Sequence, residues 1–303
     1  MPMSIVVVGS INADLRVRVG RHPKPGETLP GVGGGVSPGG KGANQAVAAA
    51  LLGGQVRMIG AVGDDAHAVE ALSILKSAGV DLSGVDLVPG PTGLALVVVA
   101  DSGENSIIVV PGANGTVDAR AAQRHSKAIA DAGVVVVQGE IPAEGIEAAA
   151  RLAKGRLVVN LAPVVPIDPA TLRRADPLVV NEHEGALTLE GLGRSAEGLD
   201  EESVVNALLQ CGVPSVVMTL GPRGALVADG STVEQVLSPR VDAVDSTGAG
   251  DAFVGALVGG LAQGDSLLEA ARFAARVGAF ACLSEGAQAS YPSSGDTLPA
   301  TGA

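Results

Sequence analysis

The stretch Asp245-Ser246-Thr247-Gly248-Ala249-Gly250-Asp251 runs directly into the apolar segment Ala252-Phe253-Val254-Gly255-Ala256-Leu257-Val258. A Gly-Ala-Gly turn before such a segment predicts a loop that leads into the N-terminus of a buried helix. The first amides of a helix have no partner within it, and the helix dipole places partial positive charge there, so this turn is suited to bind an anion. Asp251 then has two interpretations. It caps the helix, or it accepts the proton of a hydroxyl that attacks a phosphate held by the amides.

Outward from this stretch, short β-branched runs alternate with longer Ala-rich segments. Six runs are predicted strands, at 5–8, 56–59, 134–137, 157–159, 178–180 and 216–218. Helices are predicted near 42–52, 65–78, 119–131, 143–153, 182–189, 200–210, 250–262 and 266–283. Continuous β-branched runs are typical of parallel strands that are covered on both faces. The alternation therefore predicts a doubly wound α/β fold, with a parallel sheet flanked by helices.

Residues 15–35 and 92–110 break this alternation. Leu94–Val99 and Ile107–Val110 are joined through Asp101–Gly103, as in an antiparallel hairpin, and Arg16–Val19 alternates like a strand with one exposed face. We expect one domain over 1–303 that carries a small β-sheet lid, with lid strands from about 12–36 and 92–111. Residues 293–303 are expected to form a flexible tail.

Composition excludes several classes of partner. A formal net charge of -12 argues against nucleic acid and anionic membranes, because no basic face is available to neutralise phosphates. Two cysteines make no disulfide framework, and no apolar stretch reaches about 18 residues, which predicts a cytoplasmic protein. The N-terminus lacks the basic region of a signal peptide. The aromatic residues (Phe253, Phe273, Phe280 and Tyr291) all follow position 250, which disfavours base stacking in the first 250 residues.

A glycine-rich segment, Gly33–Gln45, carries a near match to a phosphate-binding loop. Gly35–Lys41 fits G-x-x-x-x-G-K, but Gly42 stands where that motif needs Ser or Thr to hold magnesium. We interpret the segment as a glycine-rich loop with Lys41 and Asn44 at the start of a helix, suited to the close approach of a small polyhydroxylated ligand. A flexible surface loop is the alternative.

Polar residues follow the predicted strands, at the edge of a parallel sheet where ligands gather. Asp14, Glu140, Asn160, Asn181 and Thr219 each come shortly after a strand. Asp14 could bind paired hydroxyls or cap a turn. Asn181 and Glu184 lie three residues apart on one face of a starting helix, which suits a hydrated magnesium ion near phosphates. His183 has no second histidine at a metal-binding spacing, so we interpret it as a bystander.

Five stretches together resemble the ribokinase branch of the PfkB carbohydrate kinases, namely Ser10–Asp14, Gly39–Gln45, Asn181–Glu184, Thr219–Gly224 and Asp245–Asp251. The resemblance runs from about residue 4 to 292 with the stretches in order. It implies a ribokinase-like fold and ATP-dependent phosphorylation of a sugar hydroxyl, the 5-hydroxyl of ribose.

The resemblance also implies roles for individual residues. The sugar site would comprise Asn12, Asp14, Gly40, Lys41, Asn44 and Glu140, with Asp251 as general base. The anion hole would comprise the amides of Gly248, Ala249 and Gly250. The ATP site would comprise Thr219, Gly221, Arg223, Gly224 and Gly250, with Asn181 and Glu184 on the Mg²⁺ side. The site for a monovalent cation, K⁺, would comprise Asp245, Thr247, Ala281, Ser284, Gly286 and Ser290.

Other functions stay open at this point. A kinase of the same fold could act on fructose, deoxyribose or a nucleoside, and a catalytically silent sugar-binding protein is a further alternative. Gly248 departs from the resemblance, since many ribokinases carry another small or apolar residue there. Exposed lid strands would be sheet edges, which proteins usually cover, so we expect a homodimer joined through the lid.

Overall fold

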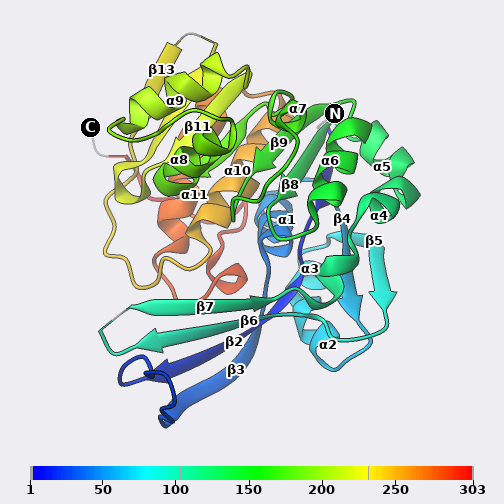
Figure 1. The fold of residues 1–303 in the computed structure, drawn as a ribbon, viewed down its shortest axis with the longest axis vertical. Coiled ribbons are helices and arrows are strands. Elements are labelled where there is room, and N and C mark those ends of the chain that lie inside the picture. The colour runs from blue at the N-terminus through cyan, green and yellow to red at the C-terminus, as the bar shows by residue number, and fades with distance from the viewer. Residues whose placement is uncertain (1–2, 103, 231, 302–303) are drawn as a thin grey trace.

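A nine-stranded sheet forms the centre of the chain in this computed structural model, which describes residues 3–102, 104–230 and 232–301. The strand order is β13-β12-β11-β10-β9-β8-β1-β4-β5, and neighbours from β11 to β5 pair in parallel (Figure 1). The bounds are β1 (Ile5–Val8), β4 (Val56–Gly63), β5 (Asp81–Val88), β8 (Val134–Gln138), β9 (Arg156–Asn160), β10 (Leu178–Asn181), β11 (Ser215–Thr219), β12 (Ala225–Asp229) and β13 (Thr232–Val236). Antiparallel β12 and β13 close one edge.

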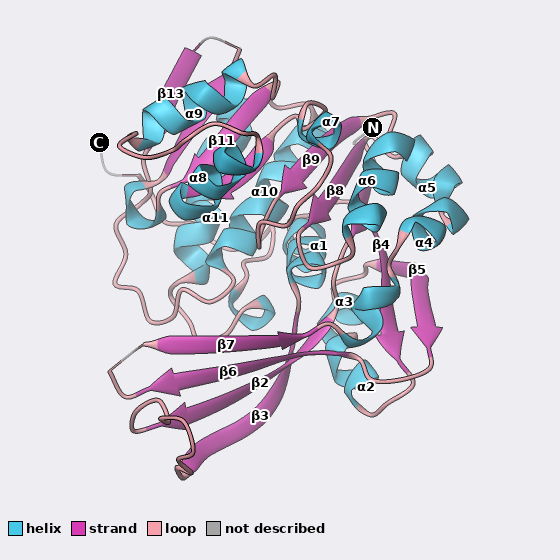
Figure 2. Cartoon of the chain, in the orientation of Figure 1, coloured by secondary structure: helices cyan, strands magenta, loops and turns pink. Residues whose placement is uncertain are grey.

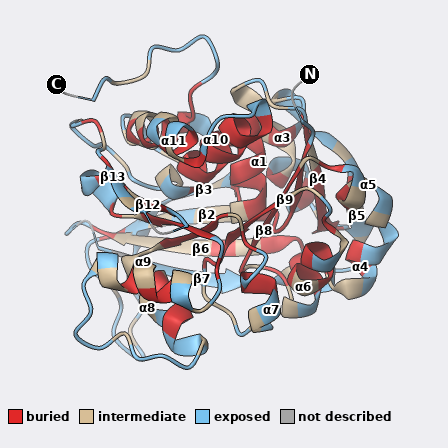
Figure 3. Cartoon of the chain, turned by 90° about the horizontal axis from the view of Figure 1, so that it is seen from above, coloured by how far each residue is buried: buried red, intermediate tan, exposed pale blue. Residues whose placement is uncertain are grey.

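Helices cover both faces of this sheet (Figure 3). One face carries α1 (Lys41–Leu51), α2 (His67–Ala71), α3 (Ser73–Ser77), α10 (Ala249–Gln263) and α11 (Leu267–Ala281). The other carries α4 (Ala119–Arg124), α5 (Ser126–Asp131), α6 (Ala143–Leu152), α7 (Pro169–Leu172), α8 (Glu182–Gly191) and α9 (Glu201–Gln210). Strand β1 shows why both faces are apolar. Ile5 and Val7 pack into the first layer, whereas Val6 and Val8 pack into the second. The expected doubly wound architecture is confirmed.

Helix α10 is the buried helix predicted after the Gly-Ala-Gly turn. Residues 251–262 are all buried, because α10 packs between α1, α11 and the sheet. Gly255 allows the close approach of α1, since a Cβ there would lie 2.5 Å from the Cβ of Ala48. The apolar run thus fixes the position of the turn that precedes it.

A second, four-stranded sheet projects from the core (Figure 2). Its order is β3 (Gly31–Gly39), β2 (Asn12–Val19), β6 (Gly93–Ala100) and β7 (Asn105–Val110). The predicted hairpin is confirmed, because β6 and β7 pair antiparallel. The prediction of a loop over residues 33–39 is wrong, since these residues form most of β3 and, apart from Gly34 at a register shift, pair with β2. Backbone pairing with β2 overrides the low strand propensity of glycine here.

Several element boundaries differ from the prediction. The six predicted strands are present, but β5, β12 and β13 were missed because they are short or rich in polar residues and Gly. The predicted helix at 65–78 is divided at Leu72 into α2 and α3, and the helix at 119–131 is divided at His125 into α4 and α5. Among the described residues, no helix is both long and apolar enough to cross a membrane.

The C-terminal segment contacts the core at more than one point. The amide of Ser294 donates to the carbonyl of Leu51 on α1 at 3.0 Å. The guanidinium of Arg276 on α11 donates hydrogen bonds to the carbonyl oxygens of Pro299, at 2.9 Å, and Leu298, at 3.2 Å. Leu298 also packs against the hydrophobic core. The flexibility of the predicted tail over 293–303 stays a prediction.

Candidate active site

Polar residues from several elements meet at the carboxyl edge of the central sheet. Asn160, Asn181 and Thr219 are the last residues of β9, β10 and β11, and Asp251 lies in the first turn of α10. They line a cavity of about 140 Å³ together with Lys41, Glu184, Gly248 and Gly250. The strand ends predicted to gather polar groups are therefore adjacent to the Gly-Ala-Gly turn.

Asp251 is buried, with 7% of its surface exposed. Its Oδ2 accepts a hydrogen bond from Asn44 Nδ2 at 2.9 Å, and its Oδ1 accepts one from Gln45 Nε2, also at 2.9 Å. The N-cap residue of α10 is Gly248, and within the described chain the Asp251 carboxylate accepts no backbone amide. The helix-cap interpretation of Asp251 is therefore wrong, and the carboxylate is held toward the cavity by two side-chain amides.

The Gly-Ala-Gly turn owes its shape to Gly248. This residue has a φ of 75°, in the left-handed region that favours glycine, and its carbonyl accepts a 3.0 Å hydrogen bond from the hydroxyl of Tyr291. A Cβ at this position would lie 2.6 Å from that hydroxyl and 2.7 Å from the Cβ of Ala287. Gly248, the residue at which this sequence departs from many ribokinases, is thus explained by the left-handed φ and by the close contacts with Tyr291 and Ala287.

The three amides expected to bind an anion are not equivalent. The amide of Ala249 already donates to the carbonyl of Ser246 at 3.2 Å. Within the described chain, the amides of Gly248 and Gly250 have no partner, and a Cβ built on Gly250 would meet nothing within 4 Å. The open amides are therefore those of the two glycines.

Lys41 is the first residue of α1 and lines the same small cavity as Asp251. The negative charge of Asp251 raises the pKa of Lys41, with a further contribution from Glu140, although burial opposes this. Burial raises the pKa of Glu184, and Lys41 counteracts that effect. The cavity thus holds a charged ammonium group beside a carboxylate and two open amides, which is an arrangement suited to a phosphoryl group.

A second group of polar residues lies where β2 of the small sheet meets the core. Burial, followed by the charges of Glu140 and Asp251, raises the pKa of Asp14 to about 7. Asp14 lies within β2, opposite Ser37, so its alternative role as a turn cap is wrong. Its Oδ1 is buried and has no partner among the described residues. Asp14 therefore keeps one carboxylate oxygen without a hydrogen bond in the described chain.

Asn12 and Glu140 form hydrogen bonds that connect the segments of the same region. Asn12 Oδ1 accepts a hydrogen bond from Asn114 Nδ2 at 2.7 Å. Glu140 Oε2 accepts one from Ser10 Oγ at 2.6 Å and one from the backbone amide of Lys41 at 3.0 Å. Next to Lys41, Gly40 has a φ of 87°, and a Cβ there would lie 2.8 Å from the Asn12 amide. These contacts join the end of β8 and the start of β2 to the N-terminus of α1.

A larger cavity, of about 720 Å³, adjoins the small one. The two share Asn181, Thr219 and Gly250, so the larger cavity opens toward the turn. Apart from Gly221 and Gly224, which were expected, its lining includes apolar residues that the sequence did not single out for binding: Pro239, Val241, Ala243, Phe253, Ala275, Ala279 and Cys282. This apolar cavity has the size and position for a nucleotide base.

Arg223, expected at the nucleotide, lines neither cavity. Its guanidinium is 54% exposed and forms ion pairs with Glu182, at 3.0 Å, and Glu201, at 2.7 Å. These ion pairs place the side chain on the surface beside α8 and α9. A contact between Arg223 and a nucleotide stays a prediction.

Asn181 and Glu184 form a capping box at the start of α8. Asn181 Oδ1 accepts from the Glu184 amide at 2.8 Å, and Glu184 Oε2 accepts from the Asn181 amide at 2.9 Å. The other carboxylate oxygen of Glu184 accepts no hydrogen bond from the described residues. One carboxylate oxygen beside the cavity fits a magnesium ion that keeps most of its waters.

Asp245, predicted at a monovalent-cation site, is surrounded by donors. Its carboxylate accepts from the amide and hydroxyl of Thr247, at 3.0 and 2.6 Å, from the amide of Gly286 at 3.1 Å, and from Arg16 at 2.8 Å. Burial opposes ionisation, but these hydrogen bonds outweigh it and lower the pKa of Asp245. Asp245 and the Gly286 turn thus lie together, and Arg16 already supplies a positive charge to this carboxylate. Ala281 ends α11, Ser284 follows it, and Ser290 lies in the turn at Gln288–Ser290.

Comparison with known proteins identifies the family. The sequence profile of the pfkB family carbohydrate kinases matches residues 3–294. The chain belongs to this family. It is 38% identical to the ribokinase of Schizosaccharomyces pombe, over 96% of this chain and 95% of that protein, and 34% identical to the deoxyribokinase of Salmonella typhi, over 96% of each. The structure of Arabidopsis thaliana ribokinase complexed with ribose and ATP is 34% identical, covers 97% of each chain and superposes with a TM-score of 0.87.

Membership of the pfkB family confirms the predicted activity class. The chain is an ATP-dependent carbohydrate kinase, and its resemblance to the ribokinase branch is confirmed. The roles of individual residues do not follow from this membership. They depend on the geometry described above.

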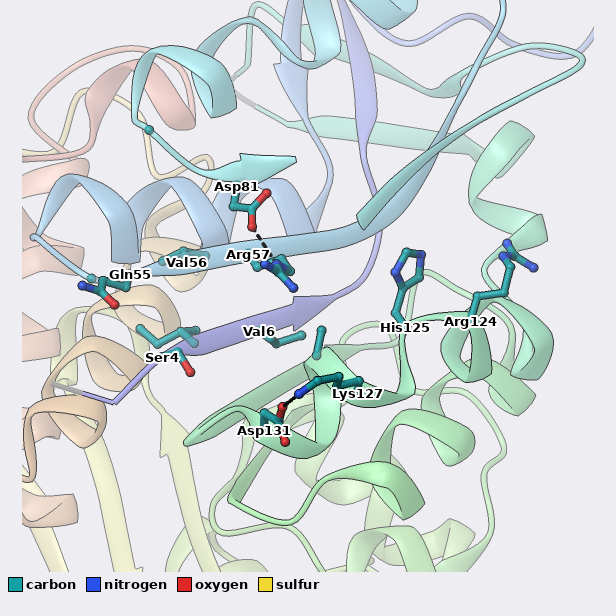
Figure 4. Close-up of a pocket in the computed structure, with 14 residues that line it drawn as sticks. Ser4, Val6, Gln55, Val56, Arg57, Asp81, Arg124, His125, Lys127 and Asp131 are labelled. Atoms are coloured by element: carbon teal, nitrogen blue, oxygen red, sulfur yellow. Dashed lines mark hydrogen bonds and ion pairs between the residues drawn. The ribbon is translucent and has the colours of Figure 1, made fainter. Parts of the chain in front are cut away.

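A further cavity, of about 700 Å³, lies away from the pfkB signature residues. It opens at the amino ends of β1, β4 and β5, the sheet edge opposite Asp251 (Figure 4). Arg57 forms an ion pair with Asp81 at 2.7 Å, and Lys127 forms one with Asp131. Arg124, which also lines the cavity, forms an ion pair with Asp86, so the Arg and Lys side chains of this lining are each already paired with a carboxylate.

Sequence reasoning missed three polar residues of this pfkB site. Gln45 and Gln288 contact Asp251 and Asn44, and Tyr291 holds Gly248. Gln45 directly follows Asn44 in the glycine-rich segment, and that adjacency was the available signal. Nothing in the local sequence around Gln288 or Tyr291 indicates a partner, because both partners are more than 40 residues away along the chain.

Proposed function

We propose that this kinase transfers the γ-phosphoryl group of ATP to the 5-hydroxyl of D-ribose and releases ribose 5-phosphate and ADP. One observation carries the proposal. The buried carboxylate of Asp251 lines one small cavity with Lys41 and the open amides of Gly248 and Gly250, and it lies close enough to Asp14 to raise the pKa of that residue. The likeness to the ribokinase structure that holds ribose and ATP supports the choice of substrates.

In this mechanism Asp251 acts as general base. It accepts the proton of the sugar hydroxyl while the hydroxyl oxygen attacks the γ-phosphorus and the bond to the β-phosphate oxygen breaks. A positioned base typically contributes about 10²–10⁴-fold in rate. The amides of Gly248 and Gly250 and the ammonium of Lys41 stabilise the charge on the transferring group. Lys41, assigned to the sugar site by resemblance, thus also serves the phosphoryl group.

The 720 Å³ cavity would hold the nucleotide, with the base against its apolar lining and the phosphates directed to Gly250. Glu184 and Asn181 would hold magnesium through water, and the ion would neutralise phosphate charge when bound. Asp245, with carbonyl oxygens of the 281–290 segment, would hold potassium. Asn12, Asp14, Asn44 and Glu140 would orient the sugar.

We further propose that the small sheet is a lid and that two copies of the chain dimerise through it. The lid exposes apolar side chains that a partner would cover, with exposed fractions of 77% for Val32, 56% for Ile107, 59% for Ile108, 45% for Val109 and 48% for Val110. The free thiols of Cys211 and Cys282 support a reducing cytoplasm as the compartment.

Deoxyribose is the second candidate substrate, because a deoxyribokinase is among the relatives at 34% identity. An ADP-release assay with Mg-ATP tests both sugars, with fructose and adenosine as further acceptors, each in potassium and in sodium. Ribose-dependent turnover that potassium increases would support the substrate and the cation site. Preference for another acceptor would keep the mechanism and change the substrate. Absence of turnover with every acceptor would favour a silent sugar-binding protein.

A further inference from the structure

Asp251 is held by two chains of buried amide side chains. Each of its carboxylate oxygens accepts one amide, from Asn44 and from Gln45, and each of these amides is itself bound by a second one. The exposed fractions are 6% for Asn44, 1% for Gln45, 1% for Gln138 and 3% for Gln288. Water is thus largely excluded from both chains.

The first chain has a fixed direction. Asn160 Nδ2 donates to the carbonyl of Val179 at 3.0 Å, so Asn160 Oδ1 faces Gln45 and accepts from its Nε2 at 2.9 Å. The same Nε2 donates to Asp251, and Gln45 Oε1 accepts from Gln138 Nε2 at 2.8 Å. The main-chain carbonyl of β10 therefore determines which end of the Gln45 amide faces the carboxylate.

The second chain starts in the C-terminal turn. Gln288 Nε2 donates to Asn44 Oδ1 at 2.9 Å, which turns the amino group of Asn44 toward Asp251 Oδ2. Gln288 lies two residues after Gly286, whose amide binds Asp245. This chain joins the Asp245–Gly286 turn to Asp251.

Stability alone poorly explains the second amide of each chain, Gln138 behind Gln45 and Gln288 behind Asn44. Gln138 Oε1 and Gln288 Oε1 are buried and have no partner among the described residues. Gly9 leaves room for the first of these, since a Cβ at Gly9 would lie 1.9 Å from Gln138 Oε1. A buried unpaired oxygen is unfavourable, and an apolar side chain of the same size would avoid that cost.

We propose that Gln45 and Gln288 are positioning residues that aim the Asp251 carboxylate at the sugar hydroxyl, an inference that rests on Asp251 acting as the base. Donors on both oxygens stabilise the ionised carboxylate and fix its plane, so that its remaining lone pairs face the cavity. A base must lie about 2.6–3.2 Å from the proton donor, and a misplacement of about 1 Å can cost about 10²-fold in rate.

Steady-state kinetics of Gln45→Met and Gln288→Met test the proposal, because methionine keeps the volume and removes the side-chain hydrogen bonds, three for Gln45 and one for Gln288. We expect kcat to fall by about 10–100-fold for Gln45→Met and by about 3–10-fold for Gln288→Met, with KM for ATP and sugar within about threefold of wild type. Ser215→Ala is the matched control. Ser215 is a buried hydroxyl that donates to Asp176 at the opposite sheet edge, so its loss lowers stability without changing kcat.

Asp251→Asn distinguishes failure of the proposed base from failure of the positioning role. If that variant keeps its turnover, the proposed base is wrong and the positioning role falls with it. If Asp251→Asn is inactive but both methionine variants keep wild-type kcat while remaining folded by thermal melting, the positioning role alone is overturned. A rise of KM in proportion to the loss of kcat/KM, with kcat unchanged, would also overturn it, because the amides would then serve binding.

Discussion

The hydroxyl of Tyr291 donates a 3.0 Å hydrogen bond to the carbonyl of Gly248, and this contact joins the C-terminal turn to the residue that precedes α10. Burial raises the pKa of Tyr291 well above its ordinary value, so the hydroxyl stays a donor throughout the neutral range. The φ of Gly248 is 75°, and its own amide has no partner among the described residues. The geometry of the proposed anion site therefore depends on both residues.

Gly248→Ala should impair catalysis and stability together. The new Cβ would clash with the Tyr291 hydroxyl. The alanine would also have to adopt a left-handed backbone conformation, which costs about 1–3 kcal/mol. We expect a lower Tm and a kcat reduced by at least about tenfold, since displacement of the turn moves the amide of Gly250. Gly259→Ala is the matched control, because Gly259 lies in the same helix with an ordinary φ and open space around it, so alanine should stabilise the helix slightly. Equal kinetics for the two variants would refute the role of the turn.

Asp251→Asn should abolish most of the turnover without loss of nucleotide binding. The amide cannot accept the proton, and about 10²–10⁴-fold of kcat is expected to disappear. Titration with a fluorescent ADP analogue should give an unchanged Kd, because the 720 Å³ cavity does not include Asp251. Asp265→Asn, an exposed aspartate after α10, is the control. An active Asp251→Asn enzyme would exclude Asp251 as the base.

The sequence was sufficient to predict which edge of the sheet carries the site. Parallel strands bring their carboxyl ends together, so Asn160, Asn181 and Thr219 had to lie side by side once the alternation of strands and helices was recognised. Asp251 was predicted for a similar reason, since an apolar helix must start at the turn before it. Both inferences use short-range patterns and one general rule of α/β topology.

The remaining features depend on packing that no local pattern encodes. Strand β3 exists because β2 offers it backbone partners, although its own sequence contains four glycines between 33 and 39. The apolar wall of the larger cavity comes from Val241, Phe253 and Cys282, which follow no shared periodicity. The partners of Gln45 and Gln288 likewise come from distant segments. Such contacts become visible only when the elements are assembled.

Ile108→Lys should separate the proposed dimer. Ile108 lies on β7 of the small sheet and is 59% exposed, so a partner that covers it would have to bury the new charge. We expect light scattering to give a monomeric mass for the variant and a dimeric mass for the wild type. Leu199→Lys is the control, because Leu199 is an exposed leucine outside the small sheet, between α8 and α9. This variant should leave the dimer intact. A wild-type monomer at micromolar concentration would contradict the dimer proposal directly.

Asp14→Asn should change how stability depends on pH. Burial, followed by the charges of Glu140 and Asp251, raises the pKa of Asp14 to about 7 in the folded chain, against 3.8 for an ordinary aspartate. Between these values the folded state binds more protons than the unfolded state, so the free energy of unfolding decreases as pH rises and the loss is complete above about pH 7. The slope from this group is at most about 1.4 kcal/mol per pH unit.

The asparagine variant lacks this contribution, so its stability relative to wild type should increase from about pH 4 to about pH 7 and then level off. Urea unfolding at several pH values, without sugar, measures the difference. Bound ribose should oppose the effect in the wild type, because hydroxyl donors stabilise the ionised carboxylate, and kcat/KM for ribose should therefore fall as pH decreases below about 7. Parallel stability curves for the two proteins would show that Asp14 is ionised in the folded chain across this range.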